Sequence, residues 1–130
     1  MKTLVIEDDF VTSQVMKEIL LSFGECDIAE DGTIGIDCFR EALESNDSYD
    51  LIFLDIMMPG LTGQEVLKVI RDLETKNGIM GLEQSKIVMS TALDDIKNVK
   101  DAFKSQAEGY IVKPIDKDKI LKILVDLEML

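Results

Sequence analysis

Histidine is absent from this sequence of 130 residues. Its absence excludes a Ser-His-Asp catalytic triad, histidine metal ligands and a histidine phosphodonor within the chain. Any imidazole that takes part in the chemistry of the protein must therefore come from a partner molecule.

Cysteine is scarce, and long apolar runs are missing. Cys26 and Cys38 are too few for a disulfide framework, and no apolar run approaches the length of a membrane span. The acids Glu7, Asp8 and Asp9 end the first apolar run too early for a signal peptide. We therefore expect reduced thiols and a cytoplasmic location.

Basic residues are outnumbered, with 14 against 26 acidic ones, and the net charge is −12. This balance argues against direct binding to nucleic acid or to an anionic membrane, because phosphate groups attract basic patches. It favours solubility and the binding of cations.

Hydrophobic residues make up 46% of the chain, which is long enough for one domain with a real core. The most informative stretch reads Leu-Ile-Phe-Leu-Asp-Ile-Met-Met-Pro-Gly over residues 51–60. A short apolar run closed by a turn signal is typical of a strand that is buried on both faces. Asp55 would then end this strand, at the position where open α/β sheets bind their ligands.

Apolar strands and amphipathic helices alternate five times along the chain. We predict strands over residues 2–6, 26–29, 51–55, 86–89 and 109–112. We predict helices over residues 11–23 and 33–43, from Thr62, from Asp94 (with Ala102 and Phe103 on its apolar side), and over residues 116–130. The pattern predicts an α/β fold in one domain over residues 1–130, with a five-stranded parallel sheet, doubly wound as (βα)5.

The carboxyl ends of parallel strands share one edge, so this architecture gathers the polar residues that end the strands. They are Glu7, Asp8, Asp9, Asp55, Ser90, Thr91 and Lys113. Crowded carboxylates repel each other unless a cation lies among them, and an all-oxygen set of ligands suits Mg²⁺. Asp55 could then act as a nucleophile and form an acyl phosphate. Lys113 and Mg²⁺ would offset the phosphoryl charge, and Thr91 would donate a hydrogen bond to it.

Simpler structural roles stay open for several of these residues. Asp9 could be a helix N-cap, Thr91 a turn former and Lys113 a solvated charge. Asp55 has the weakest alternative, because a carboxylate that ends an apolar strand needs a partner to offset its desolvation.

The same segments resemble those of response-regulator receiver domains, the phosphoacceptor half of two-component signalling in bacteria. The resemblance rests on Val-Ile-Glu-Asp-Asp at 5–9, Ala-Glu-Asp-Gly at 29–32, Leu-Asp-Ile-Met-Met-Pro at 54–59 with Gly63, Ser-Thr-Ala at 90–92 and Tyr-Ile-Val-Lys-Pro at 110–114. It extends from Lys2 to the final helix and implies the flavodoxin-like strand order 2-1-3-4-5.

The resemblance implies how an aspartyl phosphate would form. Asp55 matches the phosphorylated residue, and Glu7 and Asp8 match the acidic pair that holds Mg²⁺. The backbone carbonyl of Met57 would complete the protein's share of the metal site. The donor would be a sensor histidine kinase or a phosphotransfer protein.

The resemblance also implies how the signal is passed on. Thr91 matches the switch hydroxyl, Lys113 the lysine before proline, and Tyr110 the aromatic residue whose rotamer follows the switch. Phosphorylation would then change the affinity for a downstream target protein. Slow self-catalysed dephosphorylation is expected, without the turnover of an enzyme.

Three alternatives stay open. Three consecutive acids also permit Asp8 and Asp9 as the metal-binding pair in place of Glu7 and Asp8. Phosphatases of the haloacid-dehalogenase type use a strand-end aspartate and Mg²⁺ as well, but they need an acid two residues further on, where this chain has Met57. The third alternative is a phosphorylation-independent adaptor module that only keeps the fold.

Three further expectations concern the surface and the extent of the chain. Residues 44–49 and 76–85 are longer than usual in the family, and both should lie at the edge opposite Asp55. No output domain is expected after the final helix, so output would be by protein contact. The final helix is either a covered terminal helix or a contact surface for a partner, including a homodimer. Its apolar residues are Ile120, Leu121, Ile123, Leu124, Val125 and Leu127.

Overall fold

The computed structural model describes the backbone of residues 1–103 and 106–130. The side chains of Leu93, Asn98 and residues 101–103 also lie outside the described part, so the predicted roles of Ala102 and Phe103 fall outside it as well.

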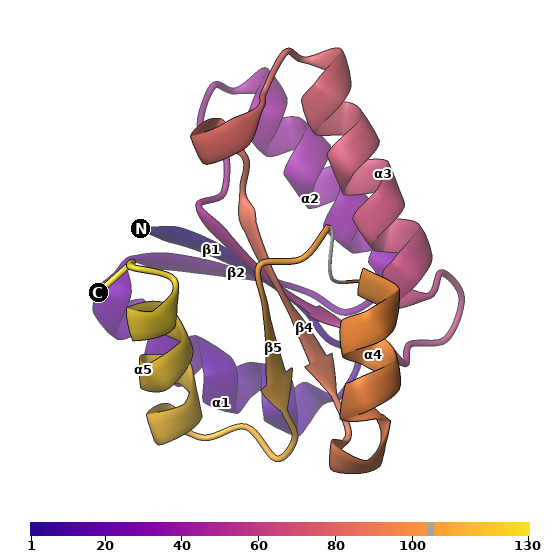
Figure 1. Cartoon of the computed structure of the whole chain (residues 1–130). Helices are drawn as coiled ribbons and strands as arrows, with labels where there is room; N and C mark the ends of the chain where they lie inside the picture. The colour runs from indigo at the N-terminus through magenta and orange to yellow at the C-terminus, as the bar shows by residue number, and fades with distance from the viewer. Residues whose placement is uncertain (104–105) are drawn as a thin grey trace.

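Five parallel strands form one sheet in the order β2-β1-β3-β4-β5 (Figure 1). The strands are β1 (Lys2–Ile6), β2 (Glu25–Ala29), β3 (Leu51–Asp55), β4 (Lys86–Thr91) and β5 (Gly109–Val112). The predicted fold class and strand order are confirmed. Because β3 lies in the middle, its carboxyl end is flanked by the ends of β1 and β4.

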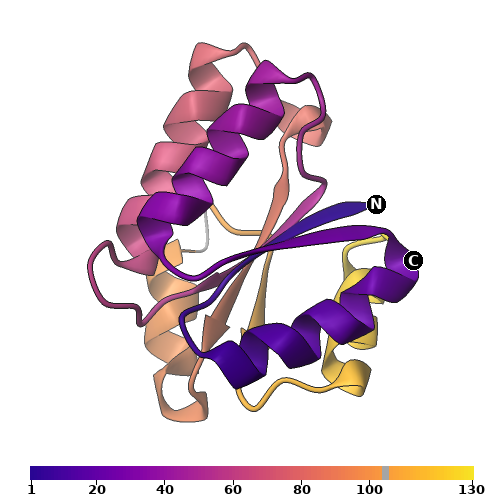
Figure 2. The same ribbon diagram turned by 180° about the vertical axis from the view of Figure 1, so that it is seen from behind.

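Helices cover both faces of the sheet (Figures 1 and 2). One face carries α2 (Gly32–Glu44), α3 (Gly63–Lys76) and α4 (Ile96–Phe103), and the other carries α1 (Phe10–Leu20) and α5 (Lys117–Asp126). Short 3-10 turns follow α1 (η1, Leu21–Phe23) and precede β4 (η2, Gly81–Glu83) and α4 (η3, Leu93–Asp95).

The side chains of β3 alternate between two apolar clusters. Ile52 and Leu54 pack in the cluster beneath α2 and α3, whereas Leu51 and Phe53 pack in the cluster beneath α1 and α5. All four are essentially inaccessible to solvent. Burial on both faces explains why this strand reads as a continuous apolar run.

Two helix ends differ from the predicted boundaries. The first helix changes to a 3-10 turn at Leu21 and stops at Gly24, whose φ of 143° suits glycine. The last helix ends at Asp126 and does not continue to Leu130, because Glu128 adopts a left-handed conformation (φ 59°). The amide of Met129 then donates to the carbonyl of Leu124 and closes the helix.

Both cysteines are free thiols, as expected. Cys26 is buried in β2, and burial raises the pKa of its thiol to about 11. Cys38 is half-buried in α2, where burial also raises the pKa of the thiol. Neither is therefore activated as a nucleophile.

Both ends of the described chain lie at the edge of the sheet where the strands begin. β1 starts at Lys2, and the ammonium of Lys86, at the start of β4, donates to the carbonyl of Leu127 just beyond α5. Within the described residues, no helix combines the length and the apolar character needed to cross a membrane.

A network of ion pairs centred on Arg71 lies at this same edge. The Arg71 Nη1 atom is 2.6 Å from Glu74 Oε1 and donates to the Ser85 carbonyl at 2.9 Å. Nη2 donates to the Gln106 carbonyl at 2.8 Å and to the Glu108 carboxylate at 2.9 Å. One guanidinium thus joins α3 to the segment before β4 and to the segment before β5. The longer loop over residues 76–85 is held at its end by this network.

Removal of this guanidinium should be costly, because it leaves the buried carboxylate of Glu74 without its charge partner. We expect Arg71→Ala to lower the free energy of unfolding by about 3 kcal/mol, measured as a shift in the urea midpoint. Arg40→Ala, which removes an exposed pair with Asp37, should cost less than about 0.5 kcal/mol. Equal effects of the two changes would contradict this account of Arg71.

Candidate functional site

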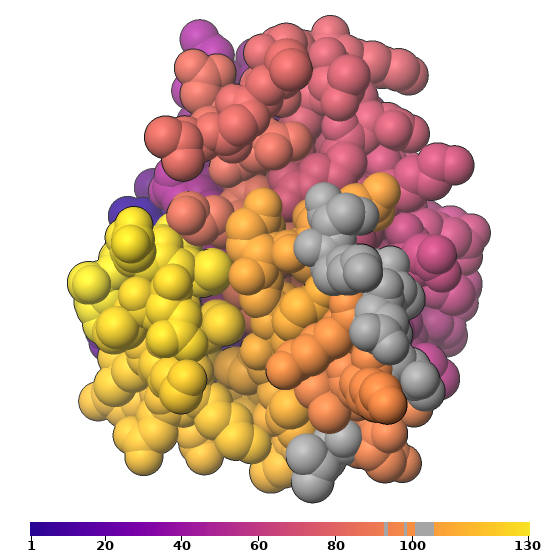
Figure 3. All heavy atoms as spheres, in the orientation of Figure 1, coloured from indigo at the N-terminus to yellow at the C-terminus, as the bar shows by residue number. Residues whose placement is uncertain are grey.

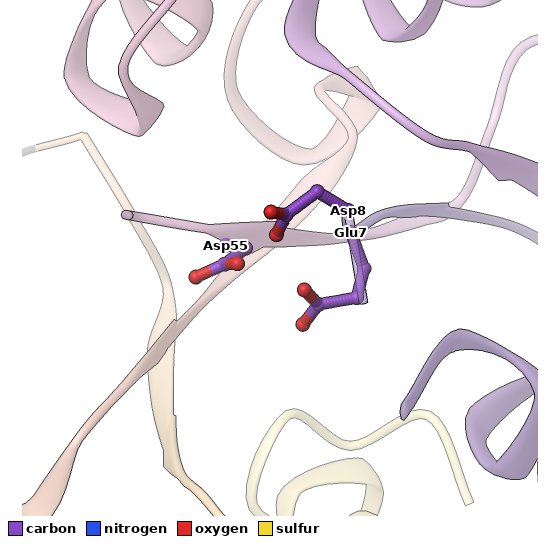
Figure 4. Close-up of side chains that lie close together, drawn as sticks. All are labelled: Glu7, Asp8 and Asp55. Atoms are coloured by element: carbon purple, nitrogen blue, oxygen red, sulfur yellow. The ribbon is translucent and has the colours of Figure 1, made fainter. Parts of the chain in front are cut away.

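Three carboxylates meet where β1 and β3 end (Figure 4). Glu7 and Asp8 follow β1, and Asp55 is the last residue of β3. One oxygen from each lies within 4.8 Å of the others. Glu7 and Asp55 are 2% and 3% exposed, whereas Asp8 is open to solvent. The cluster therefore has a buried part, formed by Glu7 and Asp55, and a solvent-accessible part, formed by Asp8.

Lys113 balances part of this negative charge. Its ammonium lies 2.9 Å from Glu7 Oε1 and 3.2 Å from Asp55 Oδ2. The backbone amide of Lys113 donates to the Thr91 carbonyl at 2.8 Å, which extends the pairing of β4 with β5 by one residue. The pairing of β5 with β4 therefore positions this lysine beside the two buried carboxylates.

Glu7 is the least satisfied member of the cluster. Its Oε2 accepts the Asp9 amide at 3.1 Å, but among the described residues its buried Oε1 accepts no well-aligned hydrogen bond. The contact of Oε1 with Lys113 is thus one of charge. Burial, and then the neighbouring Asp55, raise the pKa of Glu7 to about 7. Glu7 can lose its proton readily near neutral pH when a cation approaches.

The ammonium of Lys113 remains charged in this environment. Burial by itself would lower its pKa, but the carboxylates of Glu7 and Asp55 outweigh burial and raise it. One ammonium among three carboxylates leaves an excess of negative charge. An additional cation would therefore be favoured here.

The donor set fits Mg²⁺, since it consists of oxygens and includes one solvent-accessible carboxylate. Glu7, Asp8 and Asp55 could hold the ion, and the under-bonded oxygen of Glu7 provides a lone pair for it. Bound there, Mg²⁺ would supply charge neutralisation for a phosphoryl group.

Asp9 lies next to this cluster in sequence but has another role. Its carboxylate accepts from the amide and hydroxyl of Thr12 and caps α1. These hydrogen bonds lower the pKa of Asp9. The structure thus brings Glu7 and Asp8 to Asp55 and leaves Asp9 at the helix start, the simpler role that the sequence left open.

Met57 follows β3 in an exposed turn, with 77% of the residue accessible. Its amide donates to Asp55 Oδ1 at 3.2 Å. This hydrogen bond within the turn over residues 55–57 therefore holds the Asp55 carboxylate in its orientation.

Thr91 and Tyr110 lie on the same face of the sheet. Tyr110 pairs with Met89, two residues before Thr91. Thr91 is buried, and its hydroxyl has one long hydrogen bond within the described part, to the Ala92 carbonyl at 3.4 Å. Tyr110 is half-buried and reaches the Lys100 carbonyl in α4, also at 3.4 Å. Both hydroxyls are held loosely, so they can exchange partners at little cost.

A hollow of about 270 Å³ adjoins Glu7 and Asp8 and was not anticipated from the sequence. It is lined by Phe10, Ser13, Gln14, Ile28, Glu30 and Ile34 in addition to the two acids. Phe10 is 73% exposed. An aromatic residue directly after a run of acids was the one sequence signal for this surface.

The family model of the response regulator receiver domain matches residues 3–125. The chain belongs to the response regulator receiver domain family. Receiver domains are phosphoacceptor switches of two-component signalling, and this function applies to the chain as a member.

Individual relatives support this assignment. Chemotaxis protein CheY of Treponema pallidum is 30% identical over 121 residues, which are 93% of this chain and 78% of that protein. The osmosensing histidine protein kinase SLN1 of Saccharomyces cerevisiae is 33% identical over 128 residues, which are 96% of this chain. The chain spans only 10% of the length of that kinase.

A solved structure agrees with the same assignment. The receiver domain of Francisella response regulator 1452 shares 29% sequence identity with a TM-score of 0.73, and the match covers 97% of this chain and 94% of that one.

The two neighbouring aspartates should differ in their effect on metal binding. We expect Mg²⁺ at ten times its dissociation constant to stabilise the parent by about 1.4 kcal/mol, measured by thermal unfolding. Asp8→Ala should lose most of this gain, and its metal-free form should be no less stable, because repulsion within the cluster falls.

Asp9→Ala is the matched control. Loss of the N-cap should lower stability by about 1 kcal/mol, with the gain from Mg²⁺ retained. The reverse pattern, with Mg²⁺ stabilisation lost in Asp9→Ala and kept in Asp8→Ala, would show that Asp9 is the ligand.

Proposed function

We propose that this receiver domain accepts a phosphoryl group on Asp55 from the phosphohistidine of a sensor histidine kinase or phosphotransfer protein. The main support is the environment of Asp55, a buried strand-end carboxylate with Lys113 at 3.2 Å and two further carboxylates beside it. The proposed metal ligands are Glu7, Asp8, Asp55 and the backbone carbonyl of Met57. The chain has no histidine, so the donor imidazole belongs to the partner.

In the proposed transfer, a carboxylate oxygen of Asp55 attacks phosphorus and forms a new O–P bond. The P–N bond to the donor imidazole breaks, and its electron pair stays on the nitrogen, which takes up a proton. Lys113 offsets charge on the phosphoryl oxygens. The Met57 amide keeps the other carboxylate oxygen of Asp55 in place during the attack.

The proposed signal follows from the loosely held hydroxyls. A phosphoryl oxygen on Asp55 would offer Thr91 a stronger, charged acceptor than the Ala92 carbonyl. Movement of Thr91 would free space on the face that it shares with Tyr110. Tyr110 would then exchange its long bond to the Lys100 carbonyl for a more buried position. This change biases the arrangement of α4 and β5.

The proposed contact face lies over α4, β5 and α5, which Figure 3 shows side by side in orange and yellow. A hollow of about 200 Å³ between β5 and α5 supports it, and Tyr110 is one of its lining residues. Ile120 and Leu124 are fully buried, whereas Val125 is 56% exposed. A downstream target protein, or a second copy of the chain, would bind here in a phosphorylation-dependent manner.

A haloacid-dehalogenase-type reaction has no support in the geometry. Met57 stands at the position of the required acid and cannot transfer a proton.

Dephosphorylation is proposed to be slow and to use the same residues that hold the phosphoryl group. One receiver domain over residues 1–130 carries all of these proposed steps. The proposed location is the cytoplasm, in line with two free thiols.

Asp55 is the first residue to test. With Mg²⁺ and acetyl phosphate, the parent should gain one alkali-labile phosphoryl group, observed as a mass increase of the intact protein. Asp55→Asn should show no increase, since the amide is not a nucleophile. Asp72→Asn, an exposed change in α3, should behave like the parent. Uptake by Asp55→Asn at the parental rate would place the acceptor elsewhere.

Lys113 should be needed for the response more than for the fold. We expect Lys113→Ala to unfold as cooperatively as the parent but to lose the shift of the Tyr110 resonances when Mg²⁺ and beryllofluoride are added. Lys68→Ala, an exposed lysine of α3, should keep that shift. A parental Tyr110 response in Lys113→Ala would refute the role proposed for this lysine.

A further inference from the structure

Gly63 approaches the backbone of the acceptor strand closely. It is the first residue of α3, and its amide donates to the Ile56 carbonyl at 3.2 Å. A Cβ atom at this position would lie 2.7 Å from the Ile56 Cα and 2.8 Å from the Asp55 carbonyl oxygen. Both distances are well below van der Waals contact. Any other residue at position 63 must therefore displace backbone.

The strand side of this contact is fixed by pairing. Asp55 is in register with Ser90 of β4, and the Ile56 amide donates to the Ser90 carbonyl at 3.3 Å. The preceding Leu54 pairs with Ile6 of β1 on the other side. A shift of the strand would break hydrogen bonds on two neighbours at once.

The helix side is fixed as well. Thr62 and Glu65 form a capping box, in which the Thr62 hydroxyl accepts the Glu65 amide and the Glu65 carboxylate accepts the Thr62 amide. Val66 and Leu67, in the first turn and a half of α3, are completely buried. The helix start cannot move away from the sheet without exposing them.

A Cβ atom at position 63 would therefore strain the backbone of residues 55–57, the turn that carries the proposed chemistry. The Asp55 carboxylate accepts the Met57 amide there, and the Met57 carbonyl is a proposed metal ligand. We infer that Gly63 is a positioning residue for phosphoryl acceptance, because its missing side chain lets α3 set the backbone of the acceptor turn. This inference rests on the proposed function of Asp55.

The other close-packed helix glycines do not share this arrangement. A Cβ at Gly32 would meet the Val66 side chain, and one at Gly35 would meet the Ile6 side chain, both at 2.6 Å. Side chains can rotate away, whereas the backbone at Gly63 cannot. Gly24 does meet backbone, at Met1, but at the edge of the sheet opposite Asp55.

Gly63→Ala and Gly24→Ala both introduce a backbone clash, one at the site and one remote from it, where the φ of 143° adds further strain. We expect Gly63→Ala to take up phosphate from acetyl phosphate more slowly by roughly ten- to a hundredfold, because misplacement by about 1 Å can cost that much. Its Mg²⁺ affinity should fall, and the ¹⁹F resonances of beryllofluoride bound at Asp55 should shift or broaden. Gly24→Ala should lose stability but keep the rate, the Mg²⁺ affinity and the ¹⁹F spectrum.

Two results would overturn the inference. One is a parental rate and parental ¹⁹F spectrum in Gly63→Ala. The other is an equal loss of rate in Gly24→Ala at equal loss of stability, which would make the effect one of folding alone. If Gly63→Ala is unfolded in buffer, both variants are compared in trimethylamine N-oxide, which restores the folded state, and the same criteria apply. Failure of the parent itself to take up phosphate would instead refute the proposed function.

Discussion

The ammonium of Lys113 lies between two buried carboxylates, and the rest of the site depends on that contact. Glu7 and Asp55 end or follow neighbouring strands, so the sheet forces them together whatever their charges. Without a cation they would repel each other at close range in a poorly solvated place. Lys113 offsets part of this repulsion from the end of β5. The remaining excess of negative charge would favour a metal ion here, and through it the proposed binding of a phosphoryl group.

The charged side chains are paired more completely at the edge where the strands begin than at the edge where they end. At the edge where the strands begin, Arg71 satisfies Glu74 and Glu108 with short, nearly complete contacts, and Ser85 and Gln106 provide carbonyls for the other donors. At the edge where the strands end, Glu7 keeps an oxygen without an aligned donor among the described residues. The first edge is a closed network of ion pairs, whereas the second has an incompletely paired carboxylate that fits the proposed metal ion.

The sequence predicted the elements whose signals are local. The apolar run before Asp55 located the central strand, and the capping residue Thr62 located the start of α3. The predicted parallel topology then placed Glu7, Asp8, Asp55 and Lys113 at one edge of the sheet.

What the sequence could not supply depends on directions and distances in space. Whether Asp8 or Asp9 faces Asp55 is decided by the rotation of the chain as it enters α1, which no spacing rule specifies. The approach of Gly63 to the Asp55 backbone depends on the angle and distance at which α3 packs against the sheet. The end of α5 at Asp126 was missed because Glu128, an ordinary helix-forming residue, adopts a left-handed conformation there.

The position of the two chain ends has a consequence for how such a domain can be reused. Lys2 begins β1, and the residues after α5 reach Lys86, so both ends lie on the side of the sheet away from Asp55. A polypeptide joined to either end would leave the cluster of Glu7, Asp8 and Asp55 accessible from solution. The same fold can therefore make up most of a short protein or be embedded in a long one. The relatives illustrate both arrangements, since the chain matches most of a chemotaxis protein and a tenth of an osmosensing kinase.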